Sequence, residues 1–299
     1  MLVHLGNGRR GIRILIAGNT QVSGSLGLFF NTSVSNALQA DVWKSVIENA
    51  EEKWGPFAII LAKEFNLEQE KETIKALKAA NLRKISALPV MMMNLDSSWQ
   101  SFQDYLAAMS AKYRIRAKSA RKKGKHISSE TWGVEEIALH LDQIEELYEN
   151  VYSRARFRLM RIDPLYFLRL KQNLGKQFRF QAYFAAGRFI GFRTSFCYNN
   201  RLDAHLIGLD YEANKEHSLY LNMLYDYVEL ALENGCTQID FGRTAMEIKS
   251  TVGAEPVDFL PLVKIRNTIL NGLTCVLMEN SAPEPWVQRH PFREEITTE

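Results

Sequence analysis

The residues best suited to chemistry lie in a short polar stretch that follows an apolar segment. Asp240 ends that segment, and Gly242 and Arg243 come directly after it. A carboxylate here can accept a proton as a general base, and a neighbouring guanidinium can hold a carboxylate or a phosphate. His205 is a second candidate base if its side chain faces the same crevice. Taken alone, this stretch is an ordinary strand end. The case for a functional site here depends on the segment 211–218, which is predicted to lie opposite it.

A second polar stretch, residues 210–218, lies between an apolar segment and a helical pattern. Free N–H groups and the dipole of a helix N-terminus favour anions such as a pyrophosphate. The candidate contacts to such an anion are Tyr211, Asn214, Lys215, His217 and Ser218. Simple capping of the helix explains Asn214 or Ser218 equally well when either is considered alone.

The sharpest charge feature is a basic run between residues 112 and 125. Its cations are Lys112, Arg114, Arg116, Lys118, Arg121, Lys122, Lys123 and Lys125. They can neutralise phosphates on nucleic acid, on a nucleotide-bearing cofactor or on anionic lipid, although a solvated helix face is an equally simple interpretation. Only Tyr113 could stack on a base, so no single-strand platform is predicted. We favour phosphate contact in a substrate cleft, by Lys112, Arg114 and Arg121, over binding of duplex DNA.

The elements that position these residues form the most readable part of the sequence. Three strand patterns, at residues 177–186, 189–198 and 201–209, are joined by tight turns and predict an antiparallel meander. A helix over 216–234 and a strand over 238–241 follow. A strand, a crossover helix and a second strand in one sheet imply a parallel pair, with a ligand crevice beyond the carboxyl ends of the strands. The predicted crevice therefore lies between the ends at Leu209 and Phe241.

The rest of the chain alternates strand and helix patterns. Strands are predicted at 12–17, 26–30, 58–62, 84–95, 127–132 and 257–265, and helices at 36–53, 67–80, 98–125 and 134–154, with another opened by Asp163 and Pro164. The first strand begins so early that we expect the chain to start inside a domain whose earlier strands are missing or are supplied elsewhere. Residues 279–299 predict an irregular tail.

Composition excludes several other classes of protein. The 299 residues are 46% hydrophobic and 24% charged, as in a globular protein, and no apolar run is long enough to cross a bilayer, so a cytoplasmic location is expected. The net charge of +3 names no partner. Cys197, Cys236 and Cys275 lack paired spacing and the six histidines are scattered, so no metal site is predicted. A glycine motif at 6–11 precedes a strand instead of following one, which argues against a dinucleotide site.

The order of meander, polar loop, helix and strand resembles the GNAT superfamily of N-acyltransferases. With the sequence Asp-Phe-Gly-Arg-Thr at 240–244, the segment 249–253 and the basic run, it is similar to the branch that holds the FemAB aminoacyltransferases and the BioF2-like acetyltransferase domain. The resemblance implies an α/β (α+β) fold with a mixed, mostly antiparallel sheet flanked by helices. It also implies a tandem arrangement, with a partial first half at 1–109, a GNAT-like domain at 110–270 and an irregular extension at 271–299.

By the same resemblance, the protein is an N-acyltransferase that moves an acyl group from acyl-CoA, such as acetyl-CoA, to an amine. The donor lies between the two strand ends, with Lys249 as a further contact. However, no glycine lies between Asp210 and Leu219, so the usual glycine-containing pyrophosphate loop is absent, as it is in FemAB-type enzymes. Two alternatives stay open: a FemAB-type peptidoglycan transferase that uses aminoacyl-tRNA, and a non-catalytic polyanion-binding protein. The acceptor is either a small-molecule amine or a cell-wall precursor.

Overall fold

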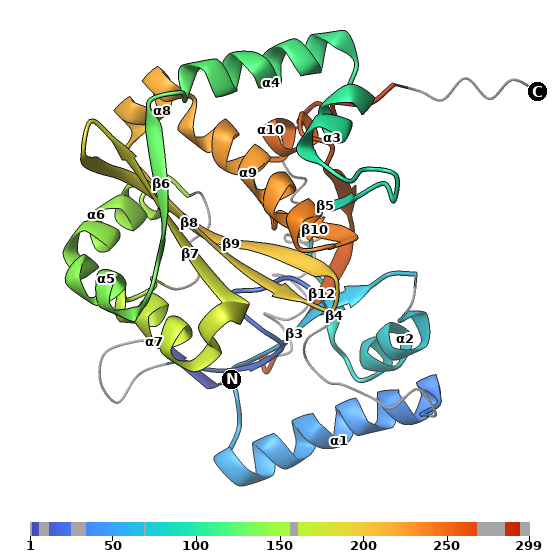
Figure 1. The fold of residues 1–299 in the computed structure, drawn as a ribbon. Helices are drawn as coiled ribbons and strands as arrows, with labels where there is room; N and C mark the ends of the chain where they lie inside the picture. Colours follow the sequence, from blue (N-terminus) through green and yellow to red (C-terminus); the bar gives the residue numbers. More distant parts are fainter. Residues whose placement is uncertain are drawn as a thin grey trace, which may run out of the picture. The chain divides into compact units, whose positions relative to one another are not determined.

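The computed structural model describes residues 2–5, 12–24, 34–68, 70–155, 161–267 and 285–293 (Figure 1). The chain forms two compact units. Unit 1 comprises Met1–Val90 and Pro256–Trp286, and unit 2 comprises Met91–Glu255 and Val287–Glu299. Both units are discontinuous in sequence, because a late strand returns to unit 1 and the chain then rejoins unit 2. The predicted strand at 26–30, the glycine motif at 6–11 and Cys275 lie outside the described residues.

Unit 1 is a sheet with two helices. Its strands are β1 (Leu2–Leu5), β2 (Ile12–Ala17), β3 (Ile59–Asn66), β4 (Arg83–Lys84) and β12 (Phe259–Ile265), in the order β1-β2-β3-β12-β4. The helices are α1 (Asn36–Trp54) and α2 (Lys71–Ala79). β2 and β3 are parallel and are joined through α1, whereas β12 runs antiparallel to β3. Trp43, Phe57 and Leu77 are buried in its core.

Unit 2 contains a seven-stranded sheet in the order β11-β5-β10-β9-β8-β7-β6. The strands are β5 (Val90–Asn94), β6 (Ile127–Trp132), β7 (Phe178–Ala185), β8 (Arg188–Tyr198), β9 (Arg201–Leu209), β10 (Gln238–Asp240) and β11 (Glu255–Val257). The helices are α3 (Phe102–Ala108), α4 (Ala111–Lys123), α5 (Val134–Leu139), α6 (Leu141–Tyr152), α7 (Leu165–Leu174), α8 (Tyr211–His217), α9 (Leu219–Glu233) and α10 (Met246–Ser250), with a 3-10 turn at Gly175–Gln177.

The predicted meander is confirmed. β6, β7, β8 and β9 pair antiparallel in sequence order. Both hairpins turn through two left-handed residues, Ala186 with Gly187 and Asn199 with Asn200. This geometry matches the twist of the flanking strands, and asparagine and glycine adopt it readily. The mixed, mostly antiparallel sheet flanked by helices is likewise as predicted, and two units, each with its own sheet, fit the tandem layout.

Three long predicted helices are each broken in two, which corrects the sequence-based prediction. The segment 98–125 divides at Met109, whose backbone is extended and forms a bridge with Phe292. The segment 134–154 divides at His140, and 216–234 becomes α8 and α9, separated by Ser218 with φ of 53°. Hydrophobic spacing continues across each break, so periodicity does not reveal a single residue that leaves the helix.

Helices cover both faces of the unit 2 sheet. Phe167 of α7 packs with Phe180 and Phe192 in an aromatic core on one face. A second core, which includes Leu219 and Met223, places α9 on the other face (Figure 1). None of the described helices is long and apolar enough to cross a membrane.

Candidate active site

The strand pair predicted to carry the site is parallel, but its register differs from expectation. Asp240, the last residue of β10, pairs with Asp203, the third residue of β9. β9 continues for six residues beyond that pair, to Leu209. The two carboxyl ends are therefore about 20 Å apart along the strand direction instead of side by side. The predicted crevice between Leu209 and Phe241 is corrected to the point where β10 ends and β9 continues.

The chain leaves β10 through a turn that requires left-handed backbone. Gly242, Thr244 and Ala245 have φ of 68°, 66° and 47°. For residues with a β-carbon this conformation costs about 1–2 kcal/mol each. Strain of this kind persists only where the surrounding structure fixes it, and it concentrates at functional sites. The turn bends the chain away from β9 immediately after Asp240.

Asp240 is the centre of a buried ionic cluster. Its carboxylate is 2% exposed and accepts hydrogen bonds from Arg201 and from the Gly242 amide, at 2.6 Å for the amide. Arg201 also donates from Nε to Asp203, at 2.6 Å. Burial raises the pKa of Asp240 to about 6, against the opposing effect of the Arg201 charge. A carboxylate with this pKa is ionised at neutral pH and is a far better proton acceptor than an ordinary aspartate.

Lys249 completes this cluster from α10. Its Nζ donates to the carbonyl oxygens of Arg243 and Gly242, at 2.6 and 3.2 Å, so it fastens the left-handed turn. Burial lowers the pKa of Lys249 to about 7, although the charge of Asp240 opposes that shift. Asp240, Arg201, Asp203 and Lys249 are named the Asp240 cluster below. Two of its members exchange protons near neutral pH, which is typical of groups that act as acid and base.

The remaining predicted catalytic residues lie at different distances from this centre. Arg243 is in the turn itself, half-buried, and contributes its carbonyl to Lys249. His205 lies on β9, where its Nε2 and the hydroxyl of Tyr166 are 2.9 Å apart and its ring packs on Phe196. His205 is thus held by aromatic residues on the side of the sheet that α7 covers.

The predicted donor-binding segment is helical from Tyr211 to His217. The side chain of Asp210 caps this helix by accepting from the amides of Glu212 and Ala213, and it also pairs with Arg188. This carboxylate caps α8, whereas the helix end at which a pyrophosphate was expected is the start of α9, where the Tyr220 amide donates to Asn214.

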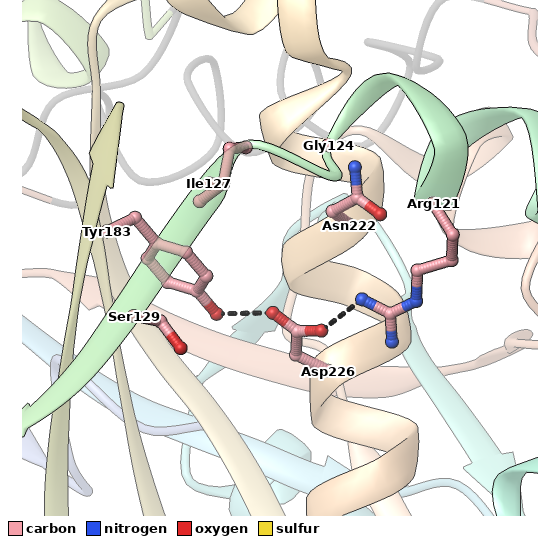
Figure 2. A pocket seen from close by; sticks show the side chains of 7 residues that line it. All are labelled: Arg121, Gly124, Ile127, Ser129, Tyr183, Asn222 and Asp226. Carbon is pink, nitrogen blue, oxygen red and sulfur yellow. Dashed lines mark hydrogen bonds and ion pairs between the residues drawn. The ribbon is translucent and has the colours of Figure 1, made fainter. Parts of the chain in front are cut away.

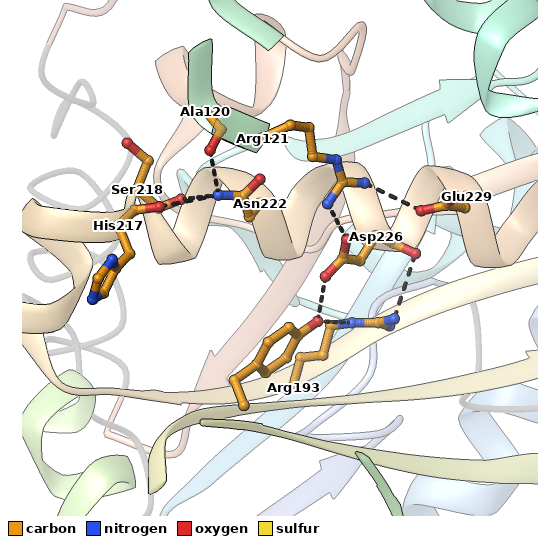
Figure 3. Close-up of polar contacts among 9 residues, drawn as sticks. Ala120, Arg121, Arg193, His217, Ser218, Asn222, Asp226 and Glu229 are labelled. Carbon is orange, nitrogen blue, oxygen red and sulfur yellow. Dashed lines mark hydrogen bonds and ion pairs between the residues drawn. The ribbon is translucent and has the colours of Figure 1, made fainter. Parts of the chain in front are cut away.

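The side chains of this segment have partners within the chain. Lys215 pairs with Glu212, Tyr211 lies under the guanidinium of Arg154, and Asn214 accepts from the Tyr220 amide. Ser218 forms the left-handed junction between the two helices, and its carbonyl and that of His217 accept from the Asn222 side chain (Figure 3).

Two of the three predicted phosphate contacts are engaged inside unit 2. Arg114 donates to the carbonyls of Met109 and Ala107, at 3.3 and 3.4 Å, and so closes the end of α3. Arg121 pairs with Asp226 and with Glu229 on α9, and its guanidinium stacks on Phe102 (Figure 3). Lys112 is exposed at the start of α4.

Arg121 belongs to a second polar network, which also lines a hollow of about 200 Å³ (Figure 2). Asp226 accepts from Arg121 and from the Tyr183 hydroxyl, at 2.6 Å for the latter. That hydroxyl accepts from Nε of Arg193, also at 2.6 Å. These four residues, named the Asp226 network below, fasten α4 and α9 to β7 and β8.

Sequence reasoning missed the partners in both groups of charges. Arg201 and Asp203 are polar residues two apart on a strand of the meander, a spacing that puts them on one face. Asn222 and Asp226 are polar residues four apart in a mostly apolar helix. Polar residues at core-facing positions were the available signal. The described residues hold no group of three or more potential metal-ligating side chains.

Comparison with known protein families identifies the central part of the chain. Residues 110–250 match the family model described as an acetyltransferase (GNAT) domain, and this part of the chain is therefore a GNAT domain. The matched segment begins directly before α4 and ends with α10, so it contains the whole Asp240 cluster. No curated protein sequence matches this chain.

Solved structures extend the fold comparison to the whole chain. FemX is similar with a TM-score of 0.60 and 12% identity, over 92% of this chain and 86% of that chain. L-PGS from Bacillus licheniformis gives 0.55 and 11%, over 93% and 85%. The C-terminal domain of a putative lysylphosphatidylglycerol synthetase from Agrobacterium fabrum gives 0.53 and 12%, over 94% and 86%. At such identities the likeness concerns the fold alone.

Proposed function

We propose that this protein transfers an acyl group to an amine, with Asp240 as the general base. The observation that carries the proposal is the position of Asp240 in the GNAT domain, at the end of β10, where β9 continues beyond it. Its pKa, raised to about 6, leaves it ionised at neutral pH and able to accept a proton. The raised pKa comes first from burial, so it belongs to this site and not to aspartate in general.

The reaction follows from these groups. Asp240 takes a proton from the acceptor ammonium, and the nitrogen lone pair then attacks the carbonyl carbon of the donor. After the attack the nitrogen carries a second excess proton, which it loses to water. The tetrahedral intermediate collapses as the bond to the leaving sulfur or oxygen breaks, and that atom takes up a proton. Lys249, with its pKa lowered to about 7, is the proposed source of that proton. Both groups are buried, so substrate access requires the turn at residues 242–245 to move.

Coenzyme A thioesters are the proposed donors. Transfer is measured as thiol release from acetyl-CoA and longer acyl-CoAs with a panel of primary amines. Asp240→Asn is expected to lower kcat by about 100-fold or more, the usual contribution of a general base. The matched control is Asp226→Asn, which removes another carboxylate that pairs with an arginine in unit 2. Equal losses in the two variants would contradict the proposed role of Asp240.

A pH profile gives a second test that does not depend on the stability of a variant. The wild-type kcat/KM is expected to fall below a pH near 6, where Asp240 becomes protonated. A profile that stays flat from pH 5 to 7 would show that another group takes the proton.

An aminoacyl-tRNA donor is the second candidate, and the exposed surface of α4 favours it. Lys118, Lys122 and Lys123 are exposed, and α4 contains no acidic residue to balance them. A polyanion binds such a surface through counterion release, with steep dependence on salt. Transfer from labelled aminoacyl-tRNA, lost when these three lysines become alanine and unchanged when Lys75 and Lys78 of α2 do, would identify this donor. Polyanion binding without turnover of either donor would favour the non-catalytic alternative.

A further inference from the structure

A hollow of about 370 Å³ in unit 2 lies between the start of α4, the helix α10 and the segment 285–293. Lys112 and Arg116 line it from α4, Arg289 lines it from the late segment, and Glu247, Ile248 and Thr251 line its α10 side. These elements are up to 177 positions apart in the sequence, Lys112 to Arg289, and the fold of this unit brings them together.

The hollow has a positive charge that is only partly balanced. Glu247 is the one carboxylate in its lining, and it pairs with Arg289 through both Nη2 and Nε, at 2.5 and 3.2 Å. Three cations against one carboxylate leave a net charge of +2. Lys112 and Arg116 lie one helical turn apart, so both can approach one bound group. An anion that accepts from several donors at once fits this lining.

The backbone adds to that potential. Lys112 is in the first turn of α4, a helix of 13 residues whose N-cap Ser110 makes no side-chain capping hydrogen bond. The free amides and the dipole of a helix N-terminus attract anions such as phosphate. By contrast, the first turn of α8 is already capped by the carboxylate of Asp210.

The hollow also lies beside the proposed reaction centre. Ile248 and Thr251 line it from α10, whereas Lys249, between them in sequence, points the other way to the carbonyls of Gly242 and Arg243. A group in the hollow and a group at the Asp240 cluster are therefore separated by one short helix.

We infer that this hollow binds a phosphate group of the acyl donor, held by Lys112, Arg116 and Arg289. The inference rests on the proposed function for the identity of the ligand as a donor, but the phosphate chemistry rests on the lining alone. The phosphate belongs either to the nucleotide part of coenzyme A or to the 3′ end of an RNA. Both present the same charged oxygens to the hollow.

The test measures binding to the full chain by calorimetry, with inorganic pyrophosphate as the first probe. Lys112→Ala combined with Arg116→Ala is expected to weaken binding at least tenfold, because each removes a charged hydrogen-bond donor. The matched control is Arg169→Ala combined with Lys176→Ala, an exposed arginine and lysine elsewhere in unit 2, with less than a threefold effect. Equal weakening in the two pairs, or no binding to the wild type, would overturn the inference.

Two further probes distinguish the sources of the phosphate. If coenzyme A binding depends on the pair in α4 and a short 3′-terminal RNA binds without that dependence, the ligand is the nucleotide; the reverse result identifies RNA. Asp240→Asn is expected to bind pyrophosphate as the wild type does. Pyrophosphate binding that needs Lys112 and Arg116, in a protein that transfers no acyl group, would refute the proposed function and leave the phosphate site standing.

Discussion

The Asp226 network and the Asp240 cluster use similar side chains inside the same unit. They differ in whether a cation of the group can lose its proton near neutral pH. In the first, the cations are two arginines, which keep their charge at any ordinary pH. In the second, Lys249 and Asp240 have pKa values of about 7 and 6. The first joins regular helices and strands, whereas the second adjoins a left-handed turn. Arginine cations suit the positioning of elements, whereas an aspartate and a lysine whose pKa values are shifted toward 7 suit proton transfer.

The largest expected difference between the two regions is in how the free energy of unfolding depends on pH when Lys249 is replaced. The pKa of Lys249 is lowered from 10.5 to about 7, so the folded state binds fewer protons than the unfolded state between these values. The stability of the wild type relative to Lys249→Met is therefore expected to rise between pH 7 and 10.5, by up to about 5 kcal/mol. Urea unfolding at several pH values measures this difference. Parallel stability curves would mean that the lysine keeps its ordinary pKa.

Arg201→Gln tests the arginine that bridges two carboxylates. The change leaves Asp203 and Asp240 buried without their shared cation, and breaking a buried ion pair in this way costs about 3–5 kcal/mol. The loss is expected to be smallest at low pH, because protonation of the carboxylates removes their repulsion. A pH-independent loss in chemical denaturation would argue against charge as the cause.

Asp226→Asn tests the positioning role of the other network. It weakens the contacts of Arg121 and Tyr183, and a loss of about 2–3 kcal/mol in unfolding free energy is expected. Transfer activity per folded molecule is expected to stay within about threefold of the wild type. A much larger loss of activity would mean that the Asp226 network takes part in catalysis, and the two groups would then not differ in role.

The smallest effect is expected from Ala245→Gly. Relief of the left-handed strain is expected to stabilise the fold by about 1 kcal/mol, and a looser turn is expected to lower the transfer rate. Thermal unfolding and the transfer assay together measure both changes. Ala186→Gly, at a left-handed position in a hairpin distant in sequence from the turn, is the control that should gain stability without losing activity.

The sequence was sufficient for features that depend on local pattern. Hairpin chemistry at Asn199 and Asn200 predicted the meander, and the crossover helix predicted that β9 and β10 are parallel. Register is not local: the pairing of Asp240 with Asp203 depends on how far β10 extends before the turn. The partners of Arg121 could not be predicted from charge alone. Arg121 lies in a run of basic residues, and the sequence does not show that it alone pairs with carboxylates of α9. The assignments of individual donor contacts stay predictions.

The late segment 285–293 has a consequence for how this domain is made. Pro291 accepts from the Ser110 amide, and Phe292 forms a bridge with Met109 and packs on the ring of Trp99. The break between α3 and α4 is therefore held by residues synthesised about 180 positions later. During translation, these contacts to the start of α4 cannot form until Pro291 and Phe292 have left the ribosome.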